Sequence, residues 1–222
     1  MPSKQQLVIQ KFWRRFNYFL ARLAYRIELI GQENIPESGP VLLVCNHISY
    51  ADSVILFGSI NRPTRFIMEE FYYRIPILNW VFRGARTIPI TSPLKNRKIF
   101  EQAEQLAKDA LSNGEMVFIF PEGRLSPKGE IIPFKRGVMR IIEDQPVNIV
   151  PVAIAGLWGS FFSHGGGSPA VKGFPKLRLG RRRVMVKFAP VLNSEDISLE
   201  DMQRKVSALH TELIDRLSKD KV

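Results

Sequence analysis

The sequence offers few residues for cross-linking or for metal binding. Its 222 residues include a single cysteine, Cys45, and three histidines. One cysteine cannot form an internal disulfide, which excludes a small disulfide-stabilised domain and favours a reducing compartment. Because three scattered histidines and one cysteine make no ligand cluster, we expect no metal site and no bound cofactor.

The N-terminal region lacks both acidic residues and an unbroken apolar run. No aspartate or glutamate precedes Glu28, and basic residues interrupt the apolar ones at positions 11, 14, 15, 22 and 26. We therefore expect neither a cleavable signal peptide nor a spanning helix in this region. The uncharged stretch 145–171 is broken too often by proline and glycine to span a bilayer.

The same N-terminal residues form a two-sided pattern at helical spacing. The basic residues fall on one arc of a helical wheel, and the adjoining side is apolar: Ile9, Phe12, Phe16, Phe19, Leu20, Leu23 and Ile27. A basic helix this rich in aromatic residues suits a membrane interface. We predict that residues 1–24 form an amphipathic membrane-associating helical segment; the alternative is an ordinary helix packed on the core.

Positive charge exceeds negative charge over the whole chain. The 32 lysines and arginines outnumber 21 acidic residues and give a formal charge of +11, with a second basic patch at 172–187. Such a surface attracts phosphate in nucleic acid, in anionic lipid or in a small molecule. The sequence contains no recognised nucleic-acid-binding module, so we expect an anionic membrane surface and no nucleic acid as partner.

Apolar runs alternate with helical patterns from residue 25 onward. We expect strands at 25–31, 41–45, 65–68, 116–120, 149–155 and 184–188, and helices at 94–112 and 198–217. Strands that alternate with helices indicate an α/β sheet. The length fits one domain, so we assign residues 25–222 to a single α/β unit.

His47 and Asp52 follow the apolar run at 41–45. If a helix opens near Ser49 or Tyr50, the Asp52 carboxylate can reach back and hold one imidazole nitrogen of His47 protonated. The other nitrogen is then free to act as a base. A histidine and an acid at this spacing are common by chance, so the pair alone is weak support for catalysis.

A second polar segment follows the run at 116–120. Gly123 permits a sharp turn after Glu122, Arg124 offers a planar fork for phosphate, and Lys135 adds a point charge. The alternative interpretation is a structural network in which Glu122 pairs with Arg124 or Lys135.

These segments together resemble the lysophosphatidic acid and lysophospholipid acyltransferases. Four blocks match in order and spacing: Asn46-His47 with Asp52, residues 84–90, residues 120–123 with 134–137, and residues 149–153. The resemblance implies the glycerolipid acyltransferase fold, a mixed β-sheet flanked by helices. It also implies that His47 is the catalytic base, that Asp52 orients it, and that the second and third blocks hold the phosphate end of the acceptor.

The second and third blocks depart from the family pattern. The family closes its second block with an acid and an arginine, whereas Thr91 and Ser92 stand here, and we expect Arg86 to substitute from nearby. The third block reads Glu-Gly-Arg-Leu, which places Arg124 one residue early. That order resembles the branch that acts on lysophospholipids with a decorated head group.

The expected reaction is acyl transfer from acyl-CoA or acyl-ACP to the free glycerol hydroxyl of a lysophospholipid, in phospholipid synthesis or remodelling. The acceptor is lysophosphatidic acid or a head-group-bearing lysophospholipid, and the expected location is peripheral, on the cytoplasmic face of the inner membrane. Cys45 offers a covalent thioester route as an alternative. A non-catalytic peripheral lipid-binding protein is the alternative function.

Overall fold

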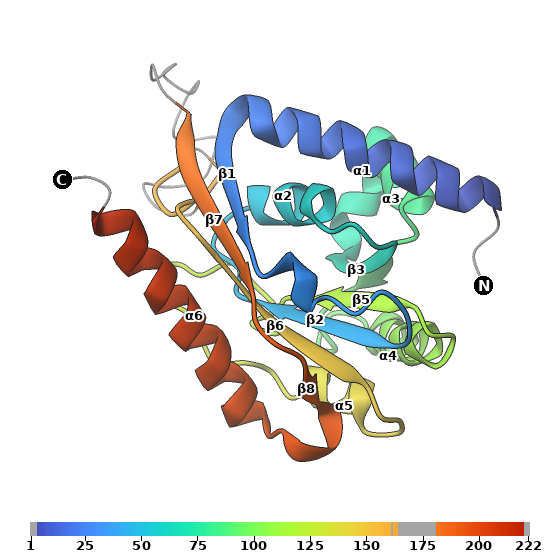
Figure 1. Cartoon of the computed structure of the whole chain (residues 1–222). Coiled ribbons are helices and arrows are strands. Elements are labelled where there is room, and N and C mark those ends of the chain that lie inside the picture. Colours follow the sequence, from blue (N-terminus) through green and yellow to red (C-terminus); the bar gives the residue numbers. More distant parts are fainter. Residues whose placement is uncertain (1–3, 161, 164–180, 220–222) are drawn as a thin grey trace.

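The computed structural model describes residues 4–160, 162–163 and 181–219. In this part of the chain, eight strands form one sheet in the order β1-β7-β6-β2-β5-β3-β4, and β8 also pairs with β6 (Figure 1). The strands are β1 (Tyr25–Ile30), β2 (Val41–Cys45), β3 (Thr64–Glu69), β4 (Ile88–Ile90), β5 (Met116–Ile119), β6 (Asn148–Ala155), β7 (Arg182–Phe188) and β8 (Leu192–Asn193). The α-helices are α1 (Lys4–Ala24), α2 (Ala51–Ser59), α3 (Pro76–Gly84), α4 (Arg97–Ser112), α5 (Gly137–Ile142) and α6 (Leu199–Lys219). Short 3₁₀ turns lie at Gln32–Asn34, Glu70–Arg74 and Ser194–Asp196.

The sheet is mixed, as expected. Strands β6, β2, β5, β3 and β4 run parallel to one another, while β7 pairs antiparallel with β6 and parallel with β1. The carboxyl ends of β2, β5 and β3 therefore meet at one edge of the sheet. Ligands of open α/β sheets bind at such an edge.

Helices cover both faces of the sheet, with α1, α2 and α3 on one side and α4, α5 and α6 on the other (Figure 1). The alternation along β2 shows why: Leu43 and Cys45 join the core under α1 and α2, while Leu42 and Val44 join the core under α4 and α5. All residues of β2 are buried. This explains the uninterrupted apolar run, since a strand covered on both faces has no solvent side.

Local signals fix the ends of the longer helices. The Asn96 side chain accepts a hydrogen bond from the Ile99 amide at 3.1 Å and caps α4. The chain leaves α4 through Gly114, whose φ of 70° suits glycine. At α6, Ser198 and Asp201 exchange hydrogen bonds between their side chains and backbone amides, as a capping box does.

Helix α1 has a buried side and an exposed aromatic side. The Gln10 amide donates to the carbonyls of Thr64 and Ala85 at 3.0 and 3.2 Å, and Ala21 is buried. Phe12 and Phe19 are 61% and 60% exposed. In the described residues, no helix has both the length and the apolar character needed to cross a bilayer. The membrane association of α1 stays a prediction.

Candidate active site

A cleft of about 680 Å³ opens where the parallel strands end. Its walls are mainly apolar and include Phe66, Phe82 and Phe100. Polar groups among its lining residues include His47, Arg124 and Lys135. A largely apolar cavity of this size with a few convergent polar groups is the usual form of a small-ligand site.

The structure places His47 and Asp52 in direct contact. His47 follows β2, Asp52 lies in the first turn of α2, and 2.9 Å separate His47 Nδ1 from Asp52 Oδ2. The same carboxylate oxygen accepts hydrogen bonds from the backbone N–H groups of Ile48 and Ser49 at 2.7 and 2.8 Å. Asp52 is fully buried, whereas the His47 side chain is 16% exposed. The carboxylate thus holds Nδ1, and Nε2 has no hydrogen-bond partner among the described residues.

Neighbouring side chains fix the turn that carries His47. The buried Asn46 amide bonds in both directions with the backbone of Ile154, at 3.0 and 2.9 Å, and ties the end of β2 to β6. The Phe120 ring stacks on the imidazole at a centroid distance of 4.0 Å. The backbone of His47 is also bound, because its carbonyl accepts a hydrogen bond from the Ser126 amide at 2.8 Å. The imidazole therefore has little freedom to turn.

Glu122 supports this turn and does not line the cleft. Its carboxylate accepts hydrogen bonds from the backbone N–H groups of His47 at 2.7 Å and Ile132 at 3.0 Å. The side chain is 1% exposed, and burial raises its pKa to about 7. The expectation that Glu122 contacts substrate finds no support in this position, because the carboxylate bonds to the backbone of both polar segments and is not among the residues that line the cleft.

Three of the expected substrate-binding residues line the same cleft as His47. Gly123 adopts a φ of 63°, and a β-carbon there would lie 2.6 Å from Lys135 Nζ, so the lysine side chain lies against the glycine backbone. Arg124 and Lys135 are exposed and line the cleft. Within the part of the chain described, neither cation has an ion-pair partner. The pair is suited to a phosphate group.

Arg86 does not join this group. Its neighbours Ala85 and Thr87 line the cleft, but its guanidinium makes two hydrogen bonds to the Glu115 carboxylate, at 2.8 and 2.9 Å. Glu115 precedes β5, so the side chain points to the opposite end of that strand from Gly123. The expectation that Arg86 replaces a missing phosphate ligand is not supported by this position.

Neither the backbone N–H groups around His47 nor the Cys45 thiol is available for catalysis in this structure. The backbone N–H groups of His47, Ile48, Ser49 and Gly123 are all bonded within the protein, so none of them is free to stabilise a reacting oxyanion. Cys45 is fully buried among core residues and is absent from the cleft lining. Burial raises the pKa of its thiol well above the ordinary value, which disfavours a nucleophilic thiolate.

The sequence analysis missed Glu69 and Tyr72, which also line the cleft. Glu69 is the last residue of β3, one position beyond the strand expected at 65–68, at the same edge as His47. A polar residue directly after an apolar run was the available signal. Among the described residues no group of three histidine, cysteine or acidic side chains is placed to hold a metal ion.

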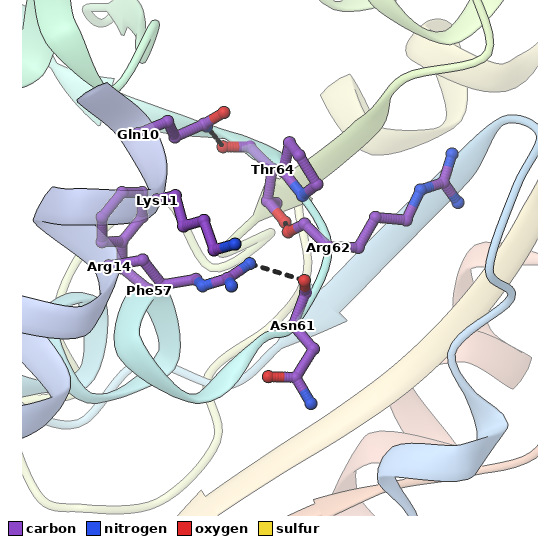
Figure 2. A pocket seen from close by; sticks show the side chains of 8 residues that line it. Gln10, Lys11, Arg14, Phe57, Asn61, Arg62 and Thr64 are labelled. Carbon is purple, nitrogen blue, oxygen red and sulfur yellow. Dashed lines mark hydrogen bonds between the residues drawn. The ribbon is translucent and has the colours of Figure 1, made fainter. Parts of the chain in front are cut away.

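A second cavity, of about 260 Å³, lies between α1 and the start of β3 (Figure 2). Lys11 and Arg14 line it, and Arg14 Nη1 donates to the carbonyl of Asn61 at 2.5 Å. It contains no histidine, cysteine or carboxylate, so it has no group suited to catalyse acyl transfer. Of the basic patch expected at 172–187, residues 172–180 lie outside the described residues.

The chain is similar to known acyltransferases in sequence. A family model described as Acyltransferase matches residues 26–155. A chloroplastic 1-acyl-sn-glycerol-3-phosphate acyltransferase of Arabidopsis thaliana is 31% identical over 161 residues, which are 68% of this chain and 44% of that protein. A 1-acyl-sn-glycerol-3-phosphate acyltransferase of Pseudomonas aeruginosa is 28% identical over 153 residues, covering 68% of this chain and 58% of that protein. The chain spans about half the length of these curated relatives.

The fold has a counterpart among solved structures. The crystal structure of the 1-acyl-sn-glycerophosphate acyltransferase from Thermotoga maritima matches with a TM-score of 0.74 and 22% identity, over 98% of this chain and 84% of that one. At this identity the match shows a shared fold. Because the family model covers β1 to β6 and both segments that build the His47 cleft, this chain belongs to the acyltransferase family.

Proposed function

We propose that this chain transfers a fatty acyl group from an acyl thioester to the free glycerol hydroxyl of a lysophospholipid. The contact between the buried Asp52 and His47, which lines a largely apolar cleft, is the observation that carries this proposal. The family match and the acyltransferase activity for which the relatives are named support the same reaction class. Acyl-CoA or acyl-ACP is the donor, and the acceptor is lysophosphatidic acid or a lysophospholipid with a larger head group.

The reaction needs one base that later acts as an acid. His47 Nε2 removes the proton from the acceptor hydroxyl while that oxygen attacks the thioester carbonyl carbon. The tetrahedral intermediate collapses, the carbon–sulfur bond breaks, and the imidazolium returns the proton to the leaving thiolate. Asp52 keeps the other nitrogen protonated and stabilises the imidazolium. The products are a diacyl phospholipid and a free thiol.

The cations of the cleft supply binding rather than proton transfer. Arg124 and Lys135 line the same cleft as His47 and hold the acceptor phosphate, so that the glycerol hydroxyl of the acceptor reaches Nε2. The apolar walls receive acyl chains, because buried methylene groups contribute about 0.8 kcal/mol each.

We further propose that the chain binds the membrane peripherally, on the cytoplasmic face of the inner membrane. The exposed side of α1 supports this, since its aromatic side chains lie next to basic ones. Trp80 of α3 is 66% exposed and contacts Trp13 of α1 at a ring-centroid distance of 5.1 Å, which extends the aromatic surface onto a second helix. A peripheral position lets the acceptor reach the cleft from the bilayer.

A coupled product assay tests the reaction. The purified chain is incubated with labelled acyl-CoA or acyl-ACP and a panel of lysophospholipids in vesicles, and diacyl product and free thiol are both quantified. Equal molar amounts of the two products are expected. Thiol release without diacyl product would indicate a thioesterase, and vesicle binding without either product would indicate the non-catalytic lipid-binding alternative.

A further inference from the structure

The cleft holds unpaired charges of both signs. Among the described residues two carboxylates line it, and Glu104 is paired with Arg140 at 2.8 Å. Glu69 has no basic partner in the same part of the chain; its Oε1 accepts a hydrogen bond from the Thr91 hydroxyl at 3.2 Å. A half-buried carboxylate without a counter-ion favours a cation in its surroundings.

The topology sets where this carboxylate stands relative to His47. Strand β5 lies between β2 and β3, and all three run parallel. Neighbouring strands are about 4.8 Å apart, so the backbones of the β2 end and the β3 end are separated by roughly 10 Å. Glu69 thus lies across the end of β5 from His47.

Arg124 and Lys135 supply the positive charge of the cleft. Both lie in or after the loop that leaves β5, and neither is within ion-pair distance of Glu69. Opposite charges that line one cleft without meeting leave space for a ligand that carries both signs. The phenol of Tyr72 also lines the cleft and offers an aromatic face to a cation.

We propose that the acceptor is a zwitterionic lysophospholipid whose phosphate binds Arg124 and Lys135 and whose ammonium group binds Glu69. This inference rests on the proposed acyl transfer and names its acceptor class: a phosphodiester bearing a primary amine. A phosphomonoester acceptor would gain the two cations but would bring a dianion close to an unpaired carboxylate.

A matched pair of acceptors isolates the ammonium group. Lysophosphatidylethanolamine and its N-acetyl derivative share the acyl chain, glycerol and phosphodiester, and only the first carries a cation. With one acyl-CoA donor, we expect wild-type kcat/KM to favour the amine by about 10-fold, mostly through KM, which corresponds to one half-buried ion pair. Lysophosphatidic acid is expected to be the poorer substrate as well.

Variants of Glu69 test the carboxylate, and a variant of its neighbour Glu70 provides the control. Glu69→Gln is expected to bring the ratio between the two acceptors close to one, whereas Glu69→Asp keeps a preference for the amine. Glu70→Gln is the matched control, because Glu70 is outside the cleft lining and pairs with Arg74 at 3.5 Å. Its ratio should equal that of the wild type.

The outcomes separate the two proposals. A wild-type ratio near one, or a Glu69→Gln ratio equal to that of the wild type, overturns the zwitterionic acceptor while product formation still supports acyl transfer. No product from any acceptor overturns both. The wild-type ratio needs no variant, so a ratio near one overturns the zwitterionic acceptor even if Glu69→Gln fails to fold. Glu69→Asp then tests the carboxylate, because a ratio for this variant equal to that of the wild type supports the ammonium site and a ratio near one overturns it.

Discussion

Asp52 is the residue whose hydrogen bonds restrict the catalytic group most directly. One of its oxygens binds His47 Nδ1 and two backbone N–H groups of the following turn. Asn at this position keeps the shape but loses the charge that stabilises an imidazolium. We expect Asp52→Asn to lower kcat by about 10²- to 10⁴-fold with little change in KM.

Steady-state kinetics at saturating donor and acceptor, with a melting curve of each protein, measure this effect. A kcat near the wild-type value in a folded Asp52→Asn protein would show that the carboxylate has only a structural role.

Glu122 makes stability depend on pH in a defined direction. Burial raises its pKa to about 7, so the folded chain keeps a proton that the unfolded chain releases above about pH 4.5. The free energy of unfolding therefore falls as the pH rises through the window from about 4.5 to 7. Glu122→Gln cannot titrate at this position, so its free energy of unfolding lacks this dependence on pH. We expect the wild type to lose about 1 to 3 kcal/mol of unfolding free energy relative to Glu122→Gln as the pH rises across the window.

Denaturant unfolding at several pH values provides the measurement, with Glu130→Gln as the control because Glu130 is an exposed residue of the same loop. Parallel pH profiles for wild type and Glu122→Gln would rule out this titration.

Cys45 distinguishes direct transfer from a covalent thioester route. The thiol is buried in the core and absent from the cleft lining. We expect Cys45→Ala to keep kcat while losing about 1 kcal/mol of stability through lost packing. Loss of activity in a stably folded Cys45→Ala protein, together with an acyl-enzyme in the wild type by mass spectrometry, would favour the covalent route.

At the residue scale, the spacing of residues in the sequence predicted contacts between side chains that are only a few residues apart. His47 and Asp52 are five residues apart across a strand-to-helix turn, so their contact could be expected from sequence. The side-chain directions of Arg86 and Glu122 could not, because their partners Glu115 and Ile132 come from other segments. Glu69 was missed because its strand runs one residue further than the apolar pattern.

At the scale of elements, α1 carries the prediction about membranes. Phe12, Phe16 and Phe19 are exposed on one side, while the other side packs on the domain. Replacing all three by Ser should weaken binding to anionic vesicles by at least about 100-fold, since each buried phenyl group contributes on the order of 1.5 to 3 kcal/mol. Deleting the helix is a poorer test, because Gln10 and Ala21 are part of the packed side.

Vesicle sedimentation measures the partitioning, and Leu94→Ser with Ile214→Ser provides the control, since both residues are exposed and lie away from α1. Unchanged partitioning of the triple variant would show that α1 is an ordinary packed helix.

Helices and strands could be predicted from the sequence where their hydrophobic pattern extends over enough residues. Strand β2 and helix α4 follow from an apolar run and a capped helical pattern. Strands β4 and β8 have three and two residues, which is too short for a period to appear. Helix α5 is also short, with six residues, and was not expected.

At the scale of the whole molecule, the sequence indicated an α/β sheet but not its strand order. The parallel pairing of β1 with β7 joins residues far apart in the chain, for example Ile27 with Val184, and no local signal encodes it. The site depends on this order, because β5 must lie between β2 and β3 to bring His47, Arg124 and Glu69 to one edge.

The central claim is that His47 acts as the base of acyl transfer in this cleft. The most direct measurement is kcat of His47→Ala against wild type, at saturating thioester and lysophospholipid, with His210→Ala as a histidine control on α6. The account predicts a loss of at least about 10²-fold in His47→Ala alone, in a protein that its melting curve shows to be folded. A folded His47→Ala protein that turns over at the wild-type rate would contradict it.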